Sequence, residues 1–332
     1  MRVLVTGAAG FIGAAVSEAL LARGDEVVGI DSLNAYYPVS LKRDRVARVT
    51  ARGGDAFNFR QVDFADRAAL HAALEEQAFD RVVHLGAQAG VRYSLENPHA
   101  YIEANVVGHV NLLELARARG IAHFVYASSS SVYGGNARVP FSVEDRVDHP
   151  WSLYAATKKA DELFAETYAH LYRLPLTGLR FFTVYGPWGR PDMMPWLFTS
   201  AILEGRPIRL FNDGDMERDF TFIDDIVGGV LATLDHPPAD DGAVKPGGSV
   251  SPHAIYNIGN NRPENLRRVL GIIEQACGKA AIVESMPMPA GDVPRTCADI
   301  DAIARDFGYA PTTTVDEGMP RFVRWYRDYA GA

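Results

Sequence analysis

Short apolar runs alternate with amphipathic segments from the first residues to residue 181. Residues 3–5 form the first run, and residues 14–23 follow with the apolar spacing of a helix that ends before Gly24. Further strand-like runs lie at 26–30, 57–62, 81–85, 124–127 and 176–181, and further helical segments lie at 67–77 and 105–119. This alternation predicts an α/β fold with a doubly wound parallel sheet and helices on both faces. Ligands of such sheets bind at the carboxyl ends of the strands.

The composition of the chain changes after residue 183. Residues 185–195 are dense in Gly and Pro, and residues 239–252 are polar and Gly-rich, which predicts a surface loop. The stretch 219–234 looks like a return to the sheet. We therefore predict two discontinuous domains. The nucleotide-binding domain comprises 1–183 plus about 221–257, and the smaller substrate-binding lobe comprises about 184–220 plus 258–332.

Composition narrows the class of protein. A total of 33 Lys and Arg against 41 Asp and Glu gives a formal net charge of −8, which argues against nucleic acid or an anionic membrane as the main partner. Cys277 and Cys297 are too few for a disulfide framework or a zinc site, so we expect no metal. No apolar run approaches the ~18 residues of a membrane span. We expect a cytoplasmic enzyme.

Three glycines follow the first strand, at Gly7, Gly10 and Gly13. Glycines between a strand and a helix allow backbone N–H groups to approach a pyrophosphate at the helix N-terminus, the arrangement of a Rossmann-type dinucleotide site. Asp31 ends the second strand, where a carboxylate accepts hydrogen bonds from ribose hydroxyls. Because this carboxylate would repel a 2′-phosphate, the sequence predicts NAD rather than NADP. The alternative is a tight turn without a ligand.

Other cofactor contacts are expected at the start of the first helix and at the strand ends. We expect Asp63 and Phe64 to contact the adenine. Asn105 is either a cofactor contact or an amide that positions a strand. The predicted cofactor-binding set comprises Gly7, Gly10, Phe11, Ile12, Gly13, Asp31, Asn34, Asp63, Phe64, Leu85, Ala87, Asn105, Tyr154 and Lys158.

Tyr154 and Lys158 are four residues apart, so a helix would present both on one face. A free tyrosine has a pKa near ~10 and is a poor base at neutral pH, but a nearby ammonium favours the phenolate. Such a pair can exchange a proton with a sugar hydroxyl while NAD exchanges the hydride. The fifth strand runs into serines 128–131, whose hydroxyls can bind the reacting oxygen. The alternative is a surface helix with an unrelated Tyr and Lys.

The GxxGxxG spacing at 7–13 and the Tyr-Ala-Ala-Thr-Lys segment at 154–158 resemble the extended short-chain dehydrogenase/reductase superfamily. By register, the resemblance implies that Ser129, Tyr154 and Lys158 are the catalytic triad. Residues 84–98 and 181–192 look like those of the UDP-glucuronate 4-epimerases. Related 4,6-dehydratases carry Asp-Glu where this chain has Ser130 and Ser131, and UDP-glucuronate decarboxylases carry Glu at the position of Ser131. The resemblance implies NAD-dependent, reversible C4 inversion of UDP-glucuronate to UDP-galacturonate through a 4-keto intermediate.

The chemistry gives a separate reason to consider those hydroxyls. Oxidation at C4 of a hexuronic acid yields a β-keto acid, which tends to lose CO₂, so an epimerase must hold the carboxylate away from alignment with the ketone. Neutral donors at Ser130, Ser131 and Thr183 could do so without adding an acid. The alternatives are a hydroxyl-capped turn for the two serines and a buried strand-end hydroxyl for Thr183.

The nucleotide end of the substrate requires arginines, because they make forked, charge-assisted bonds to a diphosphate. The candidates for the diphosphate are Arg92, Arg190, Arg209 and Arg218. Residues 218–224 and 291–294 resemble family segments for the phosphate and the nucleotide ribose, which implies a ribose contact for Asp292. Arg190 could instead form an ion pair that anchors a loop, and Arg92 could be an ordinary surface residue. Ser94 either touches the hexose or caps a helix.

Two further features are interpreted as structural. His84 ends an apolar strand, and Asp224 with Asp225 more plausibly begins a helix than binds a metal. The enzymes that this chain resembles commonly dimerise through two helices, and the resemblance implies a homodimer through the helices at 105–119 and 154–173. Both carry apolar faces that fit a dimer, although burial against the sheet would explain part of the same pattern. The functional alternatives are a UDP-glucose/UDP-galactose 4-epimerase, in which the position of Thr183 is typically Asn, a UDP-glucuronate decarboxylase, and a silent NAD-binding scaffold.

Overall fold

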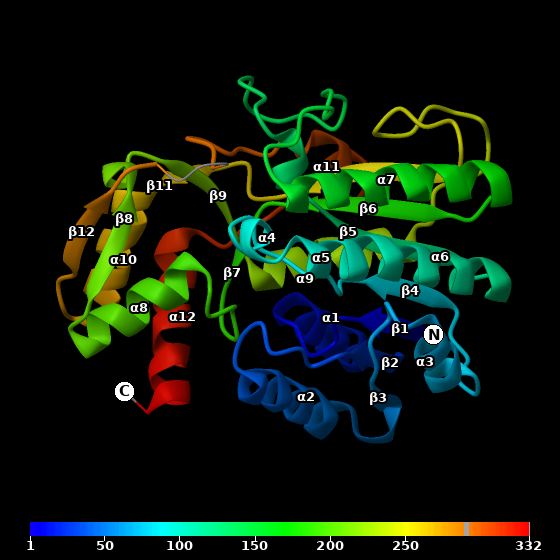
Figure 1. Ribbon diagram of the computed structural model, residues 1–332, viewed down its shortest axis with the longest axis horizontal. Coiled ribbons are helices and arrows are strands. Elements are labelled where there is room, and N and C mark those ends of the chain that lie inside the picture. The colour runs from blue at the N-terminus through cyan, green and yellow to red at the C-terminus, as the bar shows by residue number, and fades with distance from the viewer. Residues whose placement is uncertain (289–291, 332) are drawn as a thin grey trace.

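A seven-stranded parallel sheet forms the larger part of the computed structural model, which describes residues 1–288 and 292–331 (Figure 1). The strands lie in the order β10-β6-β5-β4-β1-β2-β3. The strand order reverses between β1 and β4, while all the strands stay parallel. This confirms the predicted doubly wound α/β fold. The strands are β1 (Arg2–Thr6), β2 (Glu26–Asp31), β3 (Phe57–Gln61), β4 (Arg81–His84), β5 (His123–Ser129), β6 (Leu176–Phe181) and β10 (His253–Ile258).

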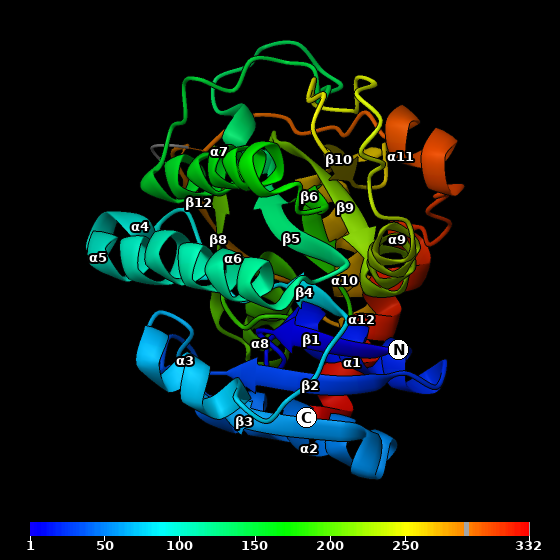
Figure 2. The same cartoon turned by 90° about the vertical axis from the view of Figure 1, so that its right-hand side faces the viewer.

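Helices cover both faces of this sheet (Figure 2). One face carries α3 (Arg67–Leu74), α6 (Gly108–Arg119) and α7 (Leu153–Tyr172). The other carries α1 (Phe11–Ala22), α2 (Val39–Gly53) and α9 (Ile223–Asp235), of which α2 and α9 both pack on α1. Short turns α4 (Tyr93–Glu96) and α5 (Pro98–Tyr101) precede α6.

Two helix predictions were wrong in detail. The helix expected to begin at residue 14 begins at Phe11, directly after the N-cap Gly10. The helix expected at 105–119 is α6 preceded by a π-helical turn, η2 (Ile102–Val107). The stretch 219–234 contains the end of a strand in a smaller sheet before α9 begins, and only α9 returns to the large sheet.

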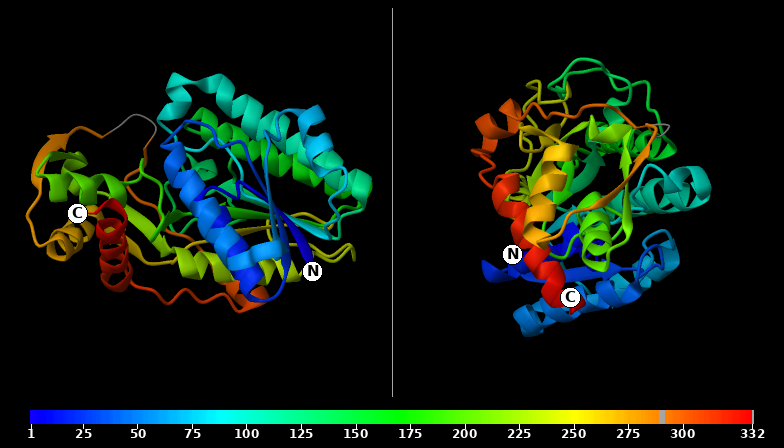
Figure 3. Two further views of the ribbon diagram at one scale, coloured as in Figure 1. Left: turned by 90° about the horizontal axis from the view of Figure 1, so that it is seen from below. Right: turned by 90° about the vertical axis from the view of Figure 1, so that its left-hand side faces the viewer.

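The smaller lobe lies beyond the carboxyl end of the sheet (Figures 1 and 3). It contains a three-stranded sheet, β11-β9-β7, and a two-stranded sheet, β12-β8. Its strands are β7 (Thr183–Tyr185), β8 (Pro207–Phe211), β9 (Glu217–Phe222), β11 (Pro263–Asn265) and β12 (Ile282–Met286). Its helices are α8 (Met194–Glu204), α10 (Leu266–Cys277) and α12 (Val315–Ala330). Between them in sequence, α11 (Asp301–Phe307) packs on β10 and α9 instead, and the predicted domain boundaries stay a prediction.

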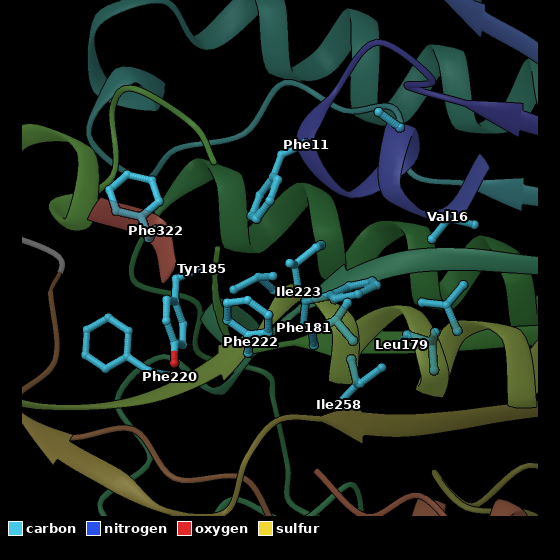
Figure 4. Packing of buried hydrophobic residues seen from close by; sticks show 14 of the residues in the cluster. Phe11, Val16, Leu179, Phe181, Tyr185, Phe220, Phe222, Ile223, Ile258 and Phe322 are labelled. Atoms are coloured by element: carbon cyan, nitrogen blue, oxygen red, sulfur yellow. The ribbon is translucent and has the colours of Figure 1, made fainter. Parts of the chain in front are cut away.

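One hydrophobic core continues from the large sheet into the smaller lobe (Figure 4). Phe11 of α1 and Phe181 of β6 belong to the same buried cluster as Phe220, Phe222 and Phe322 of the smaller lobe. This shared packing fixes the lobe over the end of the sheet. Within the described residues, no helix combines the length and apolar character needed to cross a membrane.

Candidate active site

The glycine turn packs its backbone too closely for side chains. Gly7 has φ +68°, and a Cβ on it would lie 2.7 Å from the backbone nitrogen of Gly86. A Cβ on Gly13 would lie 2.1 Å from the Gly7 carbonyl oxygen. The first turn of α1 contains no acidic residue, and Gly10 supplies no side-chain cap, so its N–H groups remain available to an anion. These features fit the pyrophosphate of a dinucleotide.

A cavity of about 610 Å³ opens over this turn at the carboxyl ends of the strands. The residues that line it extend from Asp31 at the end of β2 to Tyr154 and Lys158 of α7. Most of the predicted cofactor and catalytic residues line it, and so does the predicted substrate residue Arg190: Gly7, Gly10, Phe11, Ile12, Gly13, Asp31, Asn34, Asp63, Phe64, Leu85, Ala87, Ser129, Tyr154, Lys158 and Arg190. The structure therefore brings together residues that are up to 183 positions apart in the sequence.

Asp31 lies at the base of this cavity, at the end of β2. Its carboxylate accepts hydrogen bonds from the backbone N–H groups of Ala9 at 3.2 Å and Leu33 at 2.8 Å. Burial raises the pKa of Asp31, while Lys42 opposes this rise. Lys42 also lines the cavity and donates to Asn34 Oδ1 at 2.8 Å. Sequence reasoning missed Lys42 because the helix α2 that carries it was not predicted.

Asn105 is buried and does not line the cavity. Its amide accepts from the Gln88 N–H at 2.9 Å and donates to the Gln88 carbonyl and to Thr157 Oγ1, both at 3.0 Å. These bonds fix the loop after β4 against α7. The structure therefore agrees with a positioning role for Asn105 and gives no support to direct cofactor contact.

Arg45 joins the glycine turn to the smaller lobe and was not predicted as a site residue. Its fully buried guanidinium donates to the Ala9 carbonyl at 3.2 Å and to the carbonyls of Trp188 at 2.6 Å and Gly189 at 3.0 Å. Burial lowers the pKa of Arg45, and Tyr37 opposes this effect. One side chain thus ties the glycine turn to the loop that follows β7.

Tyr154 and Lys158 both belong to α7 and both face the cavity. The Ser152 hydroxyl caps this helix by accepting from the Ala155 N–H, which places Tyr154 in the first turn. Lys158 is buried, and its Nζ donates to the Ala127 carbonyl at 2.9 Å and to Asp161 Oδ2 at 3.1 Å. A Lys in this position is held by the protein rather than by solvent.

Ser129 ends β5 and lines the same cavity as Tyr154. Its Oγ accepts from the Ser131 N–H at 3.1 Å, so the following turn, η3 (Ser130–Tyr133), is hydroxyl-capped as one alternative predicted. The cap leaves the Ser129 hydroxyl proton free to donate. The arrangement can therefore offer a hydrogen bond to an oxygen that exchanges its proton with Tyr154.

A second cavity of about 140 Å³ lies beside the first. Its lining combines predicted substrate residues from four separate segments: Ser130, Ser131, Thr183, Arg218 and Asp292. Arg218 donates to Asp292 Oδ1 at 2.7 Å and to the Pro294 carbonyl at 3.2 Å. Gly291 of the predicted ribose segment lies outside the described residues. The ion pair orients the Arg218 guanidinium at the cavity wall.

Arg190 lines the large cavity and pairs with Asp192 through two hydrogen bonds, of 3.0 and 2.5 Å. Tyr36 donates to the same carboxylate at 3.1 Å, and burial with the nearby Asp192 raises the pKa of Tyr36 to about 12. Arg190 therefore forms the ion pair of the loop-anchoring alternative, and its side chain also lines the cavity. Tyr36, another missed residue, follows β2 in a stretch without periodic signal.

Three predicted substrate residues line neither cavity. Arg92 is exposed, with its guanidinium 4.3 Å from the centre of the Phe211 ring, and Arg209 is exposed on β8. Ser94 is buried and donates to the Val91 carbonyl at 2.6 Å. Ser94 is not the cap of α4, whose N-cap is Arg92. The structure therefore does not bring these three residues together with the other predicted site residues.

The residues interpreted as structural have internal partners. His84 Nδ1 lies 2.7 Å from Thr6 Oγ1, and burial lowers the pKa of His84 well below its ordinary value. Asp224 and Asp225 lie in the first turn of α9, where Asp224 pairs with Arg321 at 2.8 Å. Within residues 1–288 and 292–331, no three His, Cys, Asp or Glu side chains form a metal-binding cluster.

Comparison with known proteins places this geometry among nucleotide-sugar enzymes. A sequence model of the NAD dependent epimerase/dehydratase family matches residues 3–259. UDP-glucuronate 4-epimerase 1 of Arabidopsis thaliana is 49% identical over 336 residues, which cover 100% of this chain and 78% of the plant protein.

Two solved structures have the same fold. UDP-glucuronic acid 4-epimerase from Bacillus cereus, in complex with UDP-glucuronic acid and NAD, has a TM-score of 0.88 and 31% identity, with coverage of 99% of this chain and 100% of that one. The NAD complex of UDP-glucose 4-epimerase from Thermus thermophilus has a TM-score of 0.84 and 31% identity, with coverage of 98% and 99%. Similarity of fold therefore extends to relatives named for acidic and for neutral sugars, and the side chains of the site must distinguish them.

Proposed function

Because this chain belongs to the NAD dependent epimerase/dehydratase family, we propose that it is a UDP-glucuronate 4-epimerase that interconverts UDP-glucuronate and UDP-galacturonate. NAD is its cofactor. The observation that carries the proposal is the set of three neutral hydroxyl residues, Ser130, Ser131 and Thr183, around the second cavity. The carboxylate in that lining, Asp292, is paired with Arg218, so it is no free acid for a second chemical step.

Tyr154 is the acid–base residue in this proposal. Bound NAD supplies the acceptor and donor of the hydride at C4. Tyr154 takes the proton of the 4-hydroxyl group and later returns it, and Ser129 donates a hydrogen bond to the same oxygen. Lys158 favours the phenolate form of Tyr154 through its ammonium charge. The residues that would hold the cofactor are Gly7, Gly10, Gly13 and Asp31 with their neighbours in the large cavity.

Inversion at C4 requires the 4-keto sugar to present its other face to the cofactor. The nucleotide must therefore stay bound while the hexose turns. Arg218 and Arg190 are suited to the diphosphate, because each guanidinium is already oriented by a carboxylate, Asp292 or Asp192. Pre-orientation reduces the side-chain entropy lost when the ligand binds.

Retention of the carboxyl group is the distinguishing demand of this substrate. The hydroxyls of Ser130, Ser131 and Thr183 can hold the C5 carboxylate out of alignment with the C4 ketone. These three residues line the smaller cavity, and Ser129, which directly precedes Ser130, lines the larger one. The carboxylate and the reacting carbon can therefore be held at the same time. The substrate of a neutral-sugar 4-epimerase has no carboxylate for these hydroxyls to bind.

The test is to incubate the purified protein with UDP-glucuronate, without added NAD, and to separate the products with mass detection. We expect an equal-mass product with the mobility of UDP-galacturonate. Thr183→Ala should lower affinity for UDP-glucuronate and release some UDP-pentose, whereas Thr167→Ala, which removes an exposed hydroxyl on α7, should do neither. Turnover of UDP-galactose alone would identify a neutral-sugar epimerase, and NAD binding without any turnover would identify a silent scaffold.

We also propose a homodimer through α6 and α7. Leu163 and Leu171 on α7 and Val107 beside α6 are 57, 60 and 44% exposed, whereas Leu113, also expected on this face, is buried in the core. Two copies that paired these helices would cover the exposed side chains. Light scattering should report a dimer for the wild type and a monomer for Leu163→Glu.

A further inference from the structure

Asp161 stands directly behind the proposed catalytic pair. It lies three residues after Lys158 on α7, is 1% exposed, and accepts from Lys158 Nζ through Oδ2 at 3.1 Å. Its second oxygen, Oδ1, is buried without a hydrogen-bond partner among the described residues. A buried carboxylate oxygen without a partner is costly, so its presence beside the lysine of the site requires an explanation.

The neighbouring acid shows what a purely structural carboxylate looks like in this helix. Glu162 is equally buried, but its two oxygens accept from Arg180 at 2.8 and 2.9 Å and from Ser128 at 2.7 Å. Burial alone would raise the pKa of Glu162, yet the Arg180 guanidinium holds it below its ordinary value. Glu162 thus anchors α7 to the sheet with its charge compensated by Arg180, whereas the one side-chain partner of Asp161 among the described residues is Lys158.

We propose that Asp161 is a positioning residue that sets how strongly Lys158 favours the phenolate of Tyr154. This inference rests on the proposed acid–base role of Tyr154. The Asp161 carboxylate fixes the ammonium opposite the Ala127 carbonyl and offsets part of its positive charge. Tyr154 therefore keeps its proton to a higher pH than it would beside an uncompensated lysine.

Arg190 is a second cation close to Tyr154, but its charge is paired with Asp192 in every variant compared below. Besides Lys158 and Glu162, the titratable groups that face Asp161 are His109 of α6 and Tyr126 of β5. Burial lowers the pKa of His109 to about 3 and raises that of Tyr126 well above its ordinary value, so both are neutral near pH 7. Burial also raises the pKa of Asp161 to about 7, against the effect of Lys158. Its charge therefore develops near neutral pH.

The size of the effect follows from the helix. Tyr154, Lys158 and Asp161 lie on one face, and seven residues separate the first and last by about 10 Å along the axis. A unit charge at that distance, with an effective dielectric constant of about 20, shifts a proton equilibrium by about one pH unit.

The experiment compares the pH at which Tyr154 ionises in the wild type and in Asp161→Asn, which keeps the shape and can still accept from Lys158. The protein is titrated with its cofactor and without substrate, and tyrosinate absorbance is recorded in the near ultraviolet. Subtracting the titration of the matching Tyr154→Phe protein isolates Tyr154. We expect the midpoint in Asp161→Asn to fall by about one pH unit, with an equal shift of the acid limb of kcat/KM.

Glu166→Gln is the matched control. It removes a carboxylate from the same helix, but Glu166 pairs with His253, is 40% exposed, and lies about 18 Å along the axis from Tyr154, so solvent and salt screen its charge, whereas Asp161 is closer and buried. Its midpoint should stay at the wild-type value. If Asp161→Asn does not fold, Asp161→Ala removes the same charge and should give the same direction of shift.

An unchanged midpoint in the Asp161 variants, or an equal shift in Glu166→Gln, would overturn the inference. Failure of both Asp161 variants to fold would do so too, because Asp161 would then be a structural residue. Since the readout needs no substrate, a shifted midpoint in a protein that turns over no UDP-sugar would refute the proposed function and leave the electrostatic coupling standing.

Discussion

Gly13→Ala should weaken binding of the cofactor while leaving most of the fold intact. The added Cβ would lie 2.1 Å from the Gly7 carbonyl oxygen, 2.7 Å from the Gly7 carbonyl carbon and 3.2 Å from Ala8 Cα. All three atoms are backbone, so no side chain can swing away. Ordinary contact begins at 3.4 Å, and the turn must open by roughly 1 Å.

An opening of that size misaligns the N–H groups that bind the pyrophosphate. Each hydrogen bond to a charged group contributes about 1.5–3 kcal/mol, so the loss of one or two weakens NAD binding by about 1.5–6 kcal/mol. This corresponds to roughly 10-fold to 10,000-fold in Kd. The assay is calorimetric titration of NAD into protein stripped of cofactor, with the NAD content of freshly purified protein as a second readout.

Gly228→Ala is the control, because Gly228 lies in α9 and a Cβ on it would meet, apart from the neighbouring backbone of its own helix, no described atom within 4 Å. There the substitution should leave NAD binding unchanged and stabilise the helix by about 0.5–1 kcal/mol. Wild-type affinity for NAD in Gly13→Ala would show that the turn does not bind the pyrophosphate, and the assignment of the large cavity would have to be abandoned.

Three further substitutions examine the support of the site. Arg180→Met leaves Glu162 buried without its partner and should cost about 3–5 kcal/mol in urea unfolding, a loss that a wild-type midpoint would contradict. His109→Phe should flatten the pH dependence of stability: since burial lowers the pKa of His109 to about 3, the unfolded state binds more protons between there and about 6.5, and stability falls by up to about 1.4 kcal/mol per pH unit on acidification in that window. An unchanged slope of unfolding free energy against pH would refute this. Tyr154→Phe should reduce epimerisation by at least about 100-fold with unchanged NAD content, and near-normal turnover would remove Tyr154 from the acid–base role.

The sequence predicts the parts of the fold whose signal is local. β1 was recognisable from three consecutive apolar residues, Val3, Leu4 and Val5, the pattern expected of a parallel strand. In the structure all three are fully buried. β10 was not predicted, since polar residues interrupt its apolar pattern. In the structure His253 lies 2.8 Å from the hydroxyl of Tyr126, and Asn257 donates to the Phe141 carbonyl at 2.7 Å. Such strands become recognisable only when the partners of their polar side chains are known.

The same distinction applies to the site. The glycine turn, Asp31, Tyr154 and Lys158 were accessible because spacing alone brings them to one strand end or one helix face. Lys42 and Arg45 were missed, because their importance arises from contacts with Asn34 and with the turn around Trp188. Arg92 and Arg209 were chosen because arginine suits a diphosphate, but the residue type does not reveal whether the side chain faces the site. In the structure neither lines a cavity of the site.

The position of β10 has a consequence for the synthesis of this protein. β10 pairs with β6 and is the outermost strand at one edge of the large sheet, yet it follows β6 only after the chain has built α8 and α9. At about 5–20 residues per second, a ribosome needs roughly 4–15 s to make the segment between the two strands. During that interval β6 presents unpaired backbone groups that could pair with another nascent chain. Completion of the sheet must therefore wait until residue 258 has left the ribosome, and a chain released earlier would expose the edge of β6, a strand that is buried in the finished fold.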